Sequence, residues 1–230
     1  MYLPVFDTRE DGFTLPYTGN ITSLNIRKET MSKENDKISA RLHEAMELAF
    51  ELHGWDSRKQ SPVPYLAHLL SVCAMVQMDG GDEEEAIAAL LHDALEDKAD
   101  LIDGAEISRR FGERVLGIVR VSSDIPEDYK GGPKPPWKER KAAYHEHIRH
   151  TDKSLLRVTI ADKVDNARAI LADYQRIGDE LWNHFNACKE DQLWNYQESV
   201  KAYDSTGFSS PLLEELRCLV EELQQRVNAA

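Results

Sequence analysis

Apolar residues recur every three or four positions along most of this chain, which is the period of an amphipathic helix. The first such run places Ile38, Leu42, Ala45, Ala49 and Leu52 on one face. Gly54 follows as a natural helix end. Further helices are predicted over 65–78, 82–97, 105–111, 113–121, 137–150, 152–172, 179–203 and 211–227. Because strand patterns are nearly absent, we expect an all-α fold.

Two segments interrupt the helical pattern. Residues 1–35 mix Pro, Gly, Thr and Asn with few periodic apolar positions, so we predict a loosely structured N-terminal arm before one domain over 36–230. A natural helix start follows Met31, which is therefore an alternative initiator. The stretch IPEDYKGGPKPPW, residues 125–137, cannot be regular and predicts a loop.

Composition narrows the function. The 230 residues carry a net charge of −13, which argues against general nucleic-acid binding, since that needs a basic face. A small anionic substrate stays open, because local cations and a bound metal can reverse the sign inside one pocket. There is no apolar run long enough for a membrane span and no secretory pattern at the N-terminus. Three distant cysteines fit a reducing cytoplasm.

The stretch ALLHDALEDKAD, residues 89–100, begins as the wall of a buried helix and then carries groups that titrate or bind metals. In one continuous helix, His92 would stack on Glu96 and Asp93 on Asp97. Histidine and aspartate suit a borderline divalent metal. The dipeptide alone is weak evidence, because acidic residues after an apolar run often form a solvated helix end.

Two other stretches strengthen the hypothesis of a site. They are HGWDSRKQSPVPYLAH, residues 53–68, and RVTIADKVDNAR, residues 157–168. Taken singly, Asp162 would be a surface carboxylate and His68 a half-buried histidine. Three such positions within apolar helices are harder to explain as surface residues.

These pieces resemble the HD-domain hydrolases of the RelA/SpoT type, in particular the small stand-alone alarmone hydrolases. The resemblance spans about residues 38–205. The matching pieces are, in order, His53, Arg58–Lys59, Pro64–Tyr65–x–x–His68, His92–Asp93–x–x–Glu96–Asp97 and Ile160–Ala161–Asp162–Lys163–x–x–Asn166. The resemblance implies an HD-domain helical bundle. A lone HisAsp pair is a weak signal, whereas the ordered set is a strong one.

The resemblance also implies roles for these residues. The metal ligands would be His68, His92, Asp93 and Asp162. Glu96 and Asp97 would handle the attacking water. Arg58, Lys59 and Asn166 would bind the nucleotide. The implied metal is Mn²⁺, although two imidazoles and two carboxylates can equally hold Fe²⁺, Co²⁺ or Zn²⁺.

The chain departs from the family pattern at several positions. Leu69 replaces a usual proline, Pro62 and Val63 occupy the turn before Pro64, and Asp165 stands where an aromatic residue often precedes the final Asn. These changes spare the metal set. We expect them to alter the pocket wall and therefore the choice of substrate.

The activity implied by the resemblance is removal of the 3′-pyrophosphate from guanosine tetraphosphate and pentaphosphate, ppGpp and pppGpp. Three alternatives remain. Another nucleotide can be the substrate: an adenosine alarmone, a nucleoside phosphate or the 2′-phosphate of NADPH. The fold can be a catalytically silent nucleotide binder, or a helical structural protein without a site.

Two other features have competing interpretations. His145, His147 and His150 predict an exposed helix face rather than a second metal site. The leucines of 211–227 can either close the core or join a homo-oligomer.

Overall fold

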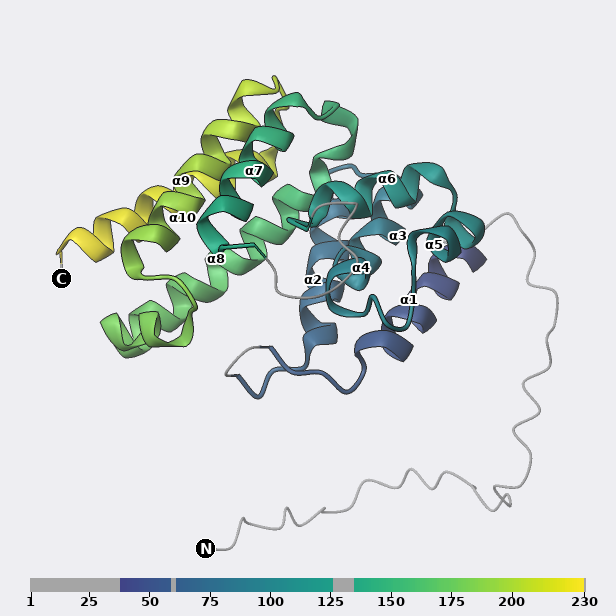
Figure 1. Cartoon of the computed structure of the whole chain (residues 1–230), viewed down its shortest axis with the longest axis horizontal. Coiled ribbons are helices and arrows are strands. Elements are labelled where there is room, and N and C mark those ends of the chain that lie inside the picture. Colours follow the sequence, from purple (N-terminus) through teal and green to yellow (C-terminus); the bar gives the residue numbers. More distant parts are fainter. Residues whose placement is uncertain (1–37, 59–60, 126–134, 230) are drawn as a thin grey trace, which may run out of the picture. The chain divides into compact units, whose positions relative to one another are not determined.

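The computed structural model describes residues 38–58, 61–125 and 135–229, and these are helical (Figure 1). The α-helices are α1 Ala40–His53, α2 Tyr65–Met78, α3 Glu83–Leu91, α4 Ala94–Asp97, α5 Gly104–Phe111, α6 Glu113–Ser122, α7 Trp137–His150, α8 Arg157–Ile177, α9 Lys189–Ser205 and α10 Pro211–Ala229. Short 3₁₀ helices, η1 Lys153–Leu155 and η2 Gly178–His184, flank α8. No strand occurs within the described ranges, only an isolated bridge between Ser57 and Pro64, so the all-α prediction is confirmed.

The predicted arm, the alternative start at Met31, residues 126–134 of the predicted loop and Lys59 all lie outside the described residues. Among the described helices, none is both long and apolar enough to cross a membrane.

Local signals fix several helix ends. The Ser39 side chain accepts a hydrogen bond from the Leu42 amide and begins α1. Asp82 and Glu85 form a capping box at the start of α3. Gly112 separates α5 from α6 with a φ of 94°, a conformation that favours glycine, so the predicted break there is confirmed.

Helix α3 lies at the centre of the α1–α6 half and packs against α1, α2 and α6 (Figure 1). Helix α8 runs from this half into the other, contacting α2 and α3 and then α10. Helices α7 and α9 pack against each other, and α9 also contacts α10. One face of α8 is therefore available to a site between the two halves.

A partly buried ion cluster connects the two halves. Arg157, at the start of α8, donates to the Asp79 carbonyl at 2.7 Å, to the Asp79 carboxylate, and to Glu85 Oε1 at 3.1 Å. Asp79 Oδ1 also accepts from the Leu212 amide of α10 at 3.2 Å. These contacts fix the N-terminal end of α8 relative to α2, α3 and α10.

The structure corrects three predicted helices. The helix predicted over 82–97 breaks at His92 and Asp93, which end α3 and begin α4. The helix predicted over 152–172 is η1 followed by α8, which extends to Ile177. The helix predicted over 179–203 is η2 and then α9. In each case, the apolar residues before and after a short connection follow the period of a single helix. The sequence pattern therefore gives no sign of the break.

The structure also bears on α10 and on the histidines of α7. The apolar face of α10 closes the core, because Leu213 and Leu216 are fully buried. His145 is buried as well, beside Trp194 at a ring-centroid distance of 5.4 Å, so its predicted place on an exposed face is wrong. His147 and His150 are exposed as expected.

Candidate metal and nucleotide site

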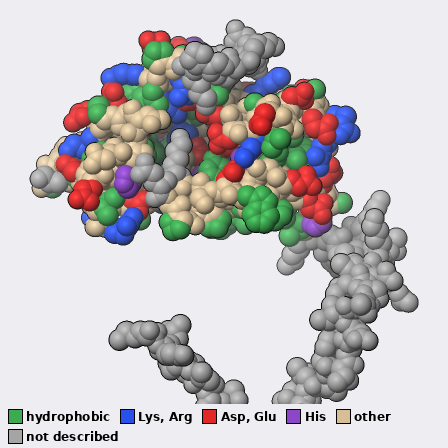
Figure 2. All heavy atoms as spheres, turned by 60° about the horizontal axis from the view of Figure 1, so that its bottom comes forward, with side chains coloured by type: hydrophobic (Ala, Val, Ile, Leu, Met, Phe, Trp, Pro, Cys, Tyr) green, Lys and Arg blue, Asp and Glu red, His purple; other side chains and the backbone are tan. Residues whose placement is uncertain are grey.

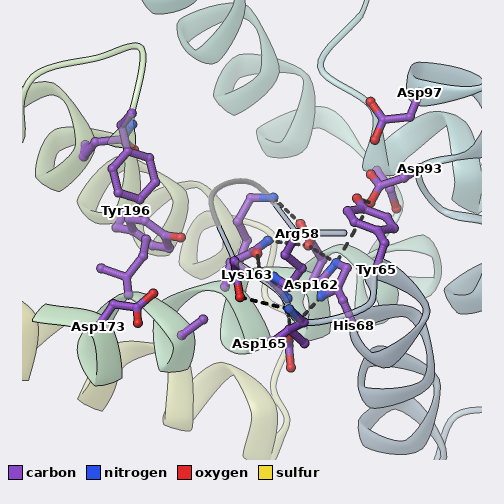
Figure 3. Close-up of a pocket in the computed structure, with 18 of the residues that line it drawn as sticks. Arg58, Tyr65, His68, Asp93, Asp97, Asp162, Lys163, Asp165, Asp173 and Tyr196 are labelled. Atoms are coloured by element: carbon purple, nitrogen blue, oxygen red, sulfur yellow. Dashed lines mark hydrogen bonds and ion pairs between the residues drawn. The ribbon is translucent and has the colours of Figure 1, made fainter. Parts of the chain in front are cut away.

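A pocket of about 630 Å³ lies between the two halves of the fold. One end carries the polar side chains of α2, α4 and the first half of α8; the other carries Asp173 of α8 and Tyr196 of α9 (Figure 3). On the face drawn in Figure 2, acidic and basic side chains are interspersed rather than gathered into one basic surface.

Three predicted ligands meet at the polar end. His68 of α2, His92 at the end of α3 and Asp162 of α8 each offer one donor atom, and these atoms lie within 4.8 Å of one another. Asp162 Oδ1 is 3.3 Å from His68 Nε2 and 3.7 Å from His92 Nε2. Residues from three separate helices therefore converge on one point, and all three are buried.

Asp93, the fourth predicted ligand, lies beside them. Its Oδ2 is 3.0 Å from His92 Nε2 and 3.9 Å from His68 Nε2. The break between α3 and α4 allows this, because neighbouring residues of an unbroken helix diverge by about 100°. Tyr65 holds the same oxygen of Asp93 by donating a hydrogen bond at 2.5 Å.

Hydrogen bonds turn both imidazoles toward this point. His92 Nδ1 lies 2.8 Å from the Ala89 carbonyl, which can only accept, so Nδ1 carries a proton. His68 Nδ1 lies 2.6 Å from the Asp165 carboxylate in the same manner. Both Nε2 atoms are left facing Asp162. His92 Nε2 is buried and makes no hydrogen bond within the described part of the chain.

The pKa values of His92 and Asp162 indicate a site that favours positive charge. Burial acts to lower the pKa of His92, but the Asp93 and Asp162 carboxylates outweigh it and raise that pKa well above its ordinary value. Burial acts to raise the pKa of Asp162, but Lys163 and the two imidazoles hold it well below its ordinary range. The buried carboxylates thus favour positive charge at this point, which a bound cation would supply.

The donor set therefore fits a divalent metal. Two imidazole nitrogens with fixed tautomers and two carboxylates suit a borderline transition-metal ion. The buried Nε2 of His92 supports this interpretation, because it faces two carboxylates, Asp93 and Asp162, without a well-aligned hydrogen bond to either.

The remaining predicted residues surround this centre. Glu96 and Asp97 of α4 line the pocket beside Asp93 (Figure 3). Arg58 and Asn166 also line it, and Arg58 Nη2 donates to Asn166 Oδ1 at 2.5 Å. Asn166 in turn donates to Asp162 Oδ1 at 2.5 Å, which links the predicted nucleotide contacts to the predicted metal ligands.

Sequence reasoning missed several polar residues of the pocket, among them Asp165, Lys163 and Lys141. Asp165 accepts hydrogen bonds from His68, Arg58 and Ser71. In the sequence, Asp165 was noted only as a position that differs from the family pattern. Lys163 is partly buried and lies 2.6 Å from Asp162 Oδ2. Lys141 of α7 lines the wall and pairs with Asp124 at 2.7 Å. The i, i+3 spacing of Asp162 and Asp165 was the one signal available for Asp165.

The departures differ in their effect on the pocket. Val63 and Asp165 line it, whereas Leu69 is fully buried in the core. The expectation that Leu69 alters the pocket wall is therefore wrong. Its side chain points to the core face of α2.

The helical fold and the His–Asp centre define the class: an HD-type domain with a candidate divalent-metal site. The model of the HD domain family matches residues 45–191, and the chain belongs to this family.

Three curated relatives are named as hydrolases of the same nucleotide. A guanosine-3′,5′-bis(diphosphate) 3′-pyrophosphohydrolase of Aquifex aeolicus is 35% identical over 132 residues, 56% of this chain and 18% of that protein. The MESH1 enzyme of Xenopus tropicalis, which carries the same name, is 33% identical over 148 residues, 63% of this chain and 75% of that protein. The human MESH1 enzyme is 30% identical over the same shares. The chain thus spans most of the small relatives and under a fifth of the large Aquifex one.

Solved structures share the fold. The lmo0812 protein of Listeria monocytogenes superposes with a TM-score of 0.59 at 26% identity, covering 69% of this chain and 99% of that one. A metazoan ortholog of SpoT superposes with a TM-score of 0.62 at 24% identity, covering 84% of this chain and 98% of that one.

Proposed function

We propose that this protein is a metal-dependent phosphohydrolase that removes the 3′-pyrophosphate of ppGpp and pppGpp. The observation that carries the proposal is the convergence of His68, His92 and Asp162, with Asp93 beside them, at one end of a nucleotide-sized pocket. The names of the relatives at 30–35% identity support the choice of ppGpp.

We propose Mn²⁺ as the resident metal, held by these four side chains. When bound, such an ion lowers the pKa of its water toward neutrality and neutralises phosphate charge. The donor chemistry alone also accommodates Fe²⁺, Co²⁺ and Zn²⁺.

The other residues would act on water and substrate. Glu96, on the pocket wall in α4, would take or relay the proton of the attacking water. Asp97 would orient that water. Arg58, Lys59 and Asn166 would bind the phosphates and sugar, Arg58 being suited to a two-point phosphate grip. The rest of the nucleotide would extend along α8 toward Asp173 and Tyr196.

Two variants separate binding from turnover. Asp93→Ala removes a metal ligand, so metal and activity should be lost together. Glu96→Ala leaves the four ligands in place, so it should keep metal and lose turnover. A Glu96→Ala enzyme with the normal rate would remove Glu96 from the mechanism.

A panel of substrates tests the alternatives within the hydrolase class. ppGpp, an adenosine alarmone, NADPH and a nucleoside phosphate are assayed side by side with the metal-loaded protein. The proposal expects the highest kcat/KM for ppGpp. A preference for another member would reassign the substrate while retaining the metal chemistry.

The same panel addresses the silent binder. Glu96 and Asp97 argue against that reading, because a protein that only binds nucleotide has no need of groups to handle water. Tight ppGpp binding without turnover by the metal-loaded protein would establish it. A protein without stoichiometric metal would instead support the purely structural alternative.

Further predictions concern the surroundings of the protein. The partner we propose is a small anionic nucleotide, with neither nucleic acid nor membrane. A cytoplasmic location is supported by Cys73, Cys188 and Cys218, which are unpaired. Homo-oligomer formation stays a prediction to be tested by measuring molecular mass in solution.

A further inference from the structure

The Asp165 carboxylate collects three donors at the junction of α2 and α8. Its Oδ2 lies 2.6 Å from His68 Nδ1 and 2.7 Å from Arg58 Nη1. Its Oδ1 accepts from Ser71 Oγ at 2.5 Å. Asp165 therefore joins His68, a proposed metal ligand, to Arg58, a cation of the pocket wall (Figure 3).

The contact with His68 decides which nitrogen can bind a metal. A carboxylate beside Nδ1 keeps the proton there and leaves the lone pair of Nε2 toward Asp162. It also fixes the plane of the ring, because the Nδ1–H bond that points at Asp165 lies in that plane. Such outer partners typically change metal affinity by about 10- to 100-fold when removed.

The contact with Arg58 decides where the substrate-side cation lies. Asp165 holds one guanidinium nitrogen and Asn166 holds the other. Two neighbouring acceptors on α8 therefore fix the plane of the guanidinium at the pocket wall before substrate arrives. Less side-chain freedom is lost on binding when a cation is already placed.

We propose that Asp165 is a positioning residue that couples the two parts of the site, fixing His68 for the metal and Arg58 for the substrate. The Arg58 part rests on the proposed function, whereas the His68 part requires only that the site binds a metal. Ser71, one helical turn beyond His68 on α2, completes the arrangement by holding the second oxygen of Asp165.

The first test measures Mn²⁺ affinity by electron paramagnetic resonance of the free ion. Asp165→Ala should raise the metal Kd about 10- to 100-fold. Asp165→Asn should restore most of the affinity, because its amide oxygen still accepts from Nδ1. Asp173→Ala is the matched control, because Asp173 lines the same pocket on the same helix but pairs with Arg176 at 2.9 Å. The Mn²⁺ Kd of this variant should equal that of the wild type.

An Asp165→Ala protein whose Kd stays within twofold of the wild type would overturn the His68 part. The wild-type protein gives an independent test if this variant fails to fold. Nitrogen-15 spectra of the Zn²⁺-loaded protein should show the His68 proton on Nδ1 and the metal on Nε2. The reverse assignment would contradict the proposal.

A double-mutant cycle tests the Arg58 part at saturating metal. Asp165→Asn alone should raise the KM for ppGpp several-fold, because Arg58 loses its charged anchor. In an Arg58→Ala background the same change should leave KM unaltered. Equal effects in both backgrounds would overturn the coupling. Absence of any ppGpp turnover would instead refute the proposed function, and the metal and spectroscopic results would still decide the His68 part.

Discussion

Replacing Tyr65 by phenylalanine should weaken metal binding without disturbing the packing of α2. The Tyr65 hydroxyl donates to Asp93 Oδ2 at 2.5 Å, and its ring stacks on His53 with a centroid distance of 5.1 Å. Burial, reinforced by the Asp93 charge, raises the pKa of Tyr65, so the phenol remains a donor at neutral pH. Phenylalanine keeps the ring and removes only this hydrogen bond.

The size of the effect follows from the charge on the acceptor. A hydrogen bond to a charged group contributes about 1.5–3 kcal/mol. If that energy holds Asp93 in its ligand position, its loss raises the metal Kd about 10- to 150-fold. At a metal concentration of 100 times the wild-type Kd, binding stabilises the wild-type fold by about 2.7 kcal/mol. A tenfold weaker variant would gain about 1.4 kcal/mol at the same concentration.

Urea unfolding with and without Mn²⁺ measures this difference. Tyr174→Phe is the control, because Tyr174 also donates to a carboxylate, Asp179, at 3.1 Å but lies away from the metal ligands. Its metal-dependent stabilisation should match that of the wild type. The reasoning is refuted if Tyr65→Phe shows the wild-type increase in stability at every metal concentration.

Three further predictions concern other parts of the molecule. Burial, assisted by Lys141 and Lys163, lowers the pKa of His145 to about 4, so the unfolded chain takes up a proton below about pH 6.5 that the folded chain does not. The free energy of unfolding should therefore fall by about 2 kcal/mol more in the wild type than in His145→Gln between pH 7 and pH 5, as measured by urea unfolding. Parallel pH profiles for the two proteins would contradict this prediction. Leu213→Ala, at a fully buried position of α10, should cost about 2–5 kcal/mol in the same assay, and a loss below 1 kcal/mol would show that α10 does not close the core. Arg58→Ala should raise the KM for ppGpp about tenfold or more with a smaller change in kcat; an unchanged KM would remove Arg58 from phosphate binding.

The helical class and the candidate metal site could be predicted from the sequence, because both depend on local pattern. The period of apolar residues identifies helices, and the ordered HD-type pieces point to His68, His92 and Asp162, which the structure brings together, and to Asp93 beside them. The break between α3 and α4 could not be predicted, since Ala89–Leu95 continue the apolar period across it. It depends instead on tertiary contacts, including the hydrogen bond from Tyr65 to Asp93.

The environments of single residues were the least predictable part. Asp165 looks like a solvated helix position until α2 places His68 and Ser71 beside it. His145 lies in a charged stretch whose spacing suggested solvent exposure, yet the packing of α7 against α9 buries it. Such contacts join residues far apart in the chain, and one sequence carries no direct record of them.

Pyrophosphate release from ppGpp by the purified protein with Mn²⁺, beside an Asp93→Ala control, tests the proposed 3′-pyrophosphohydrolase activity. We expect the wild type to release intact pyrophosphate and the variant to lose both bound metal and pyrophosphate release. A wild-type protein that holds stoichiometric metal and releases no pyrophosphate would contradict it.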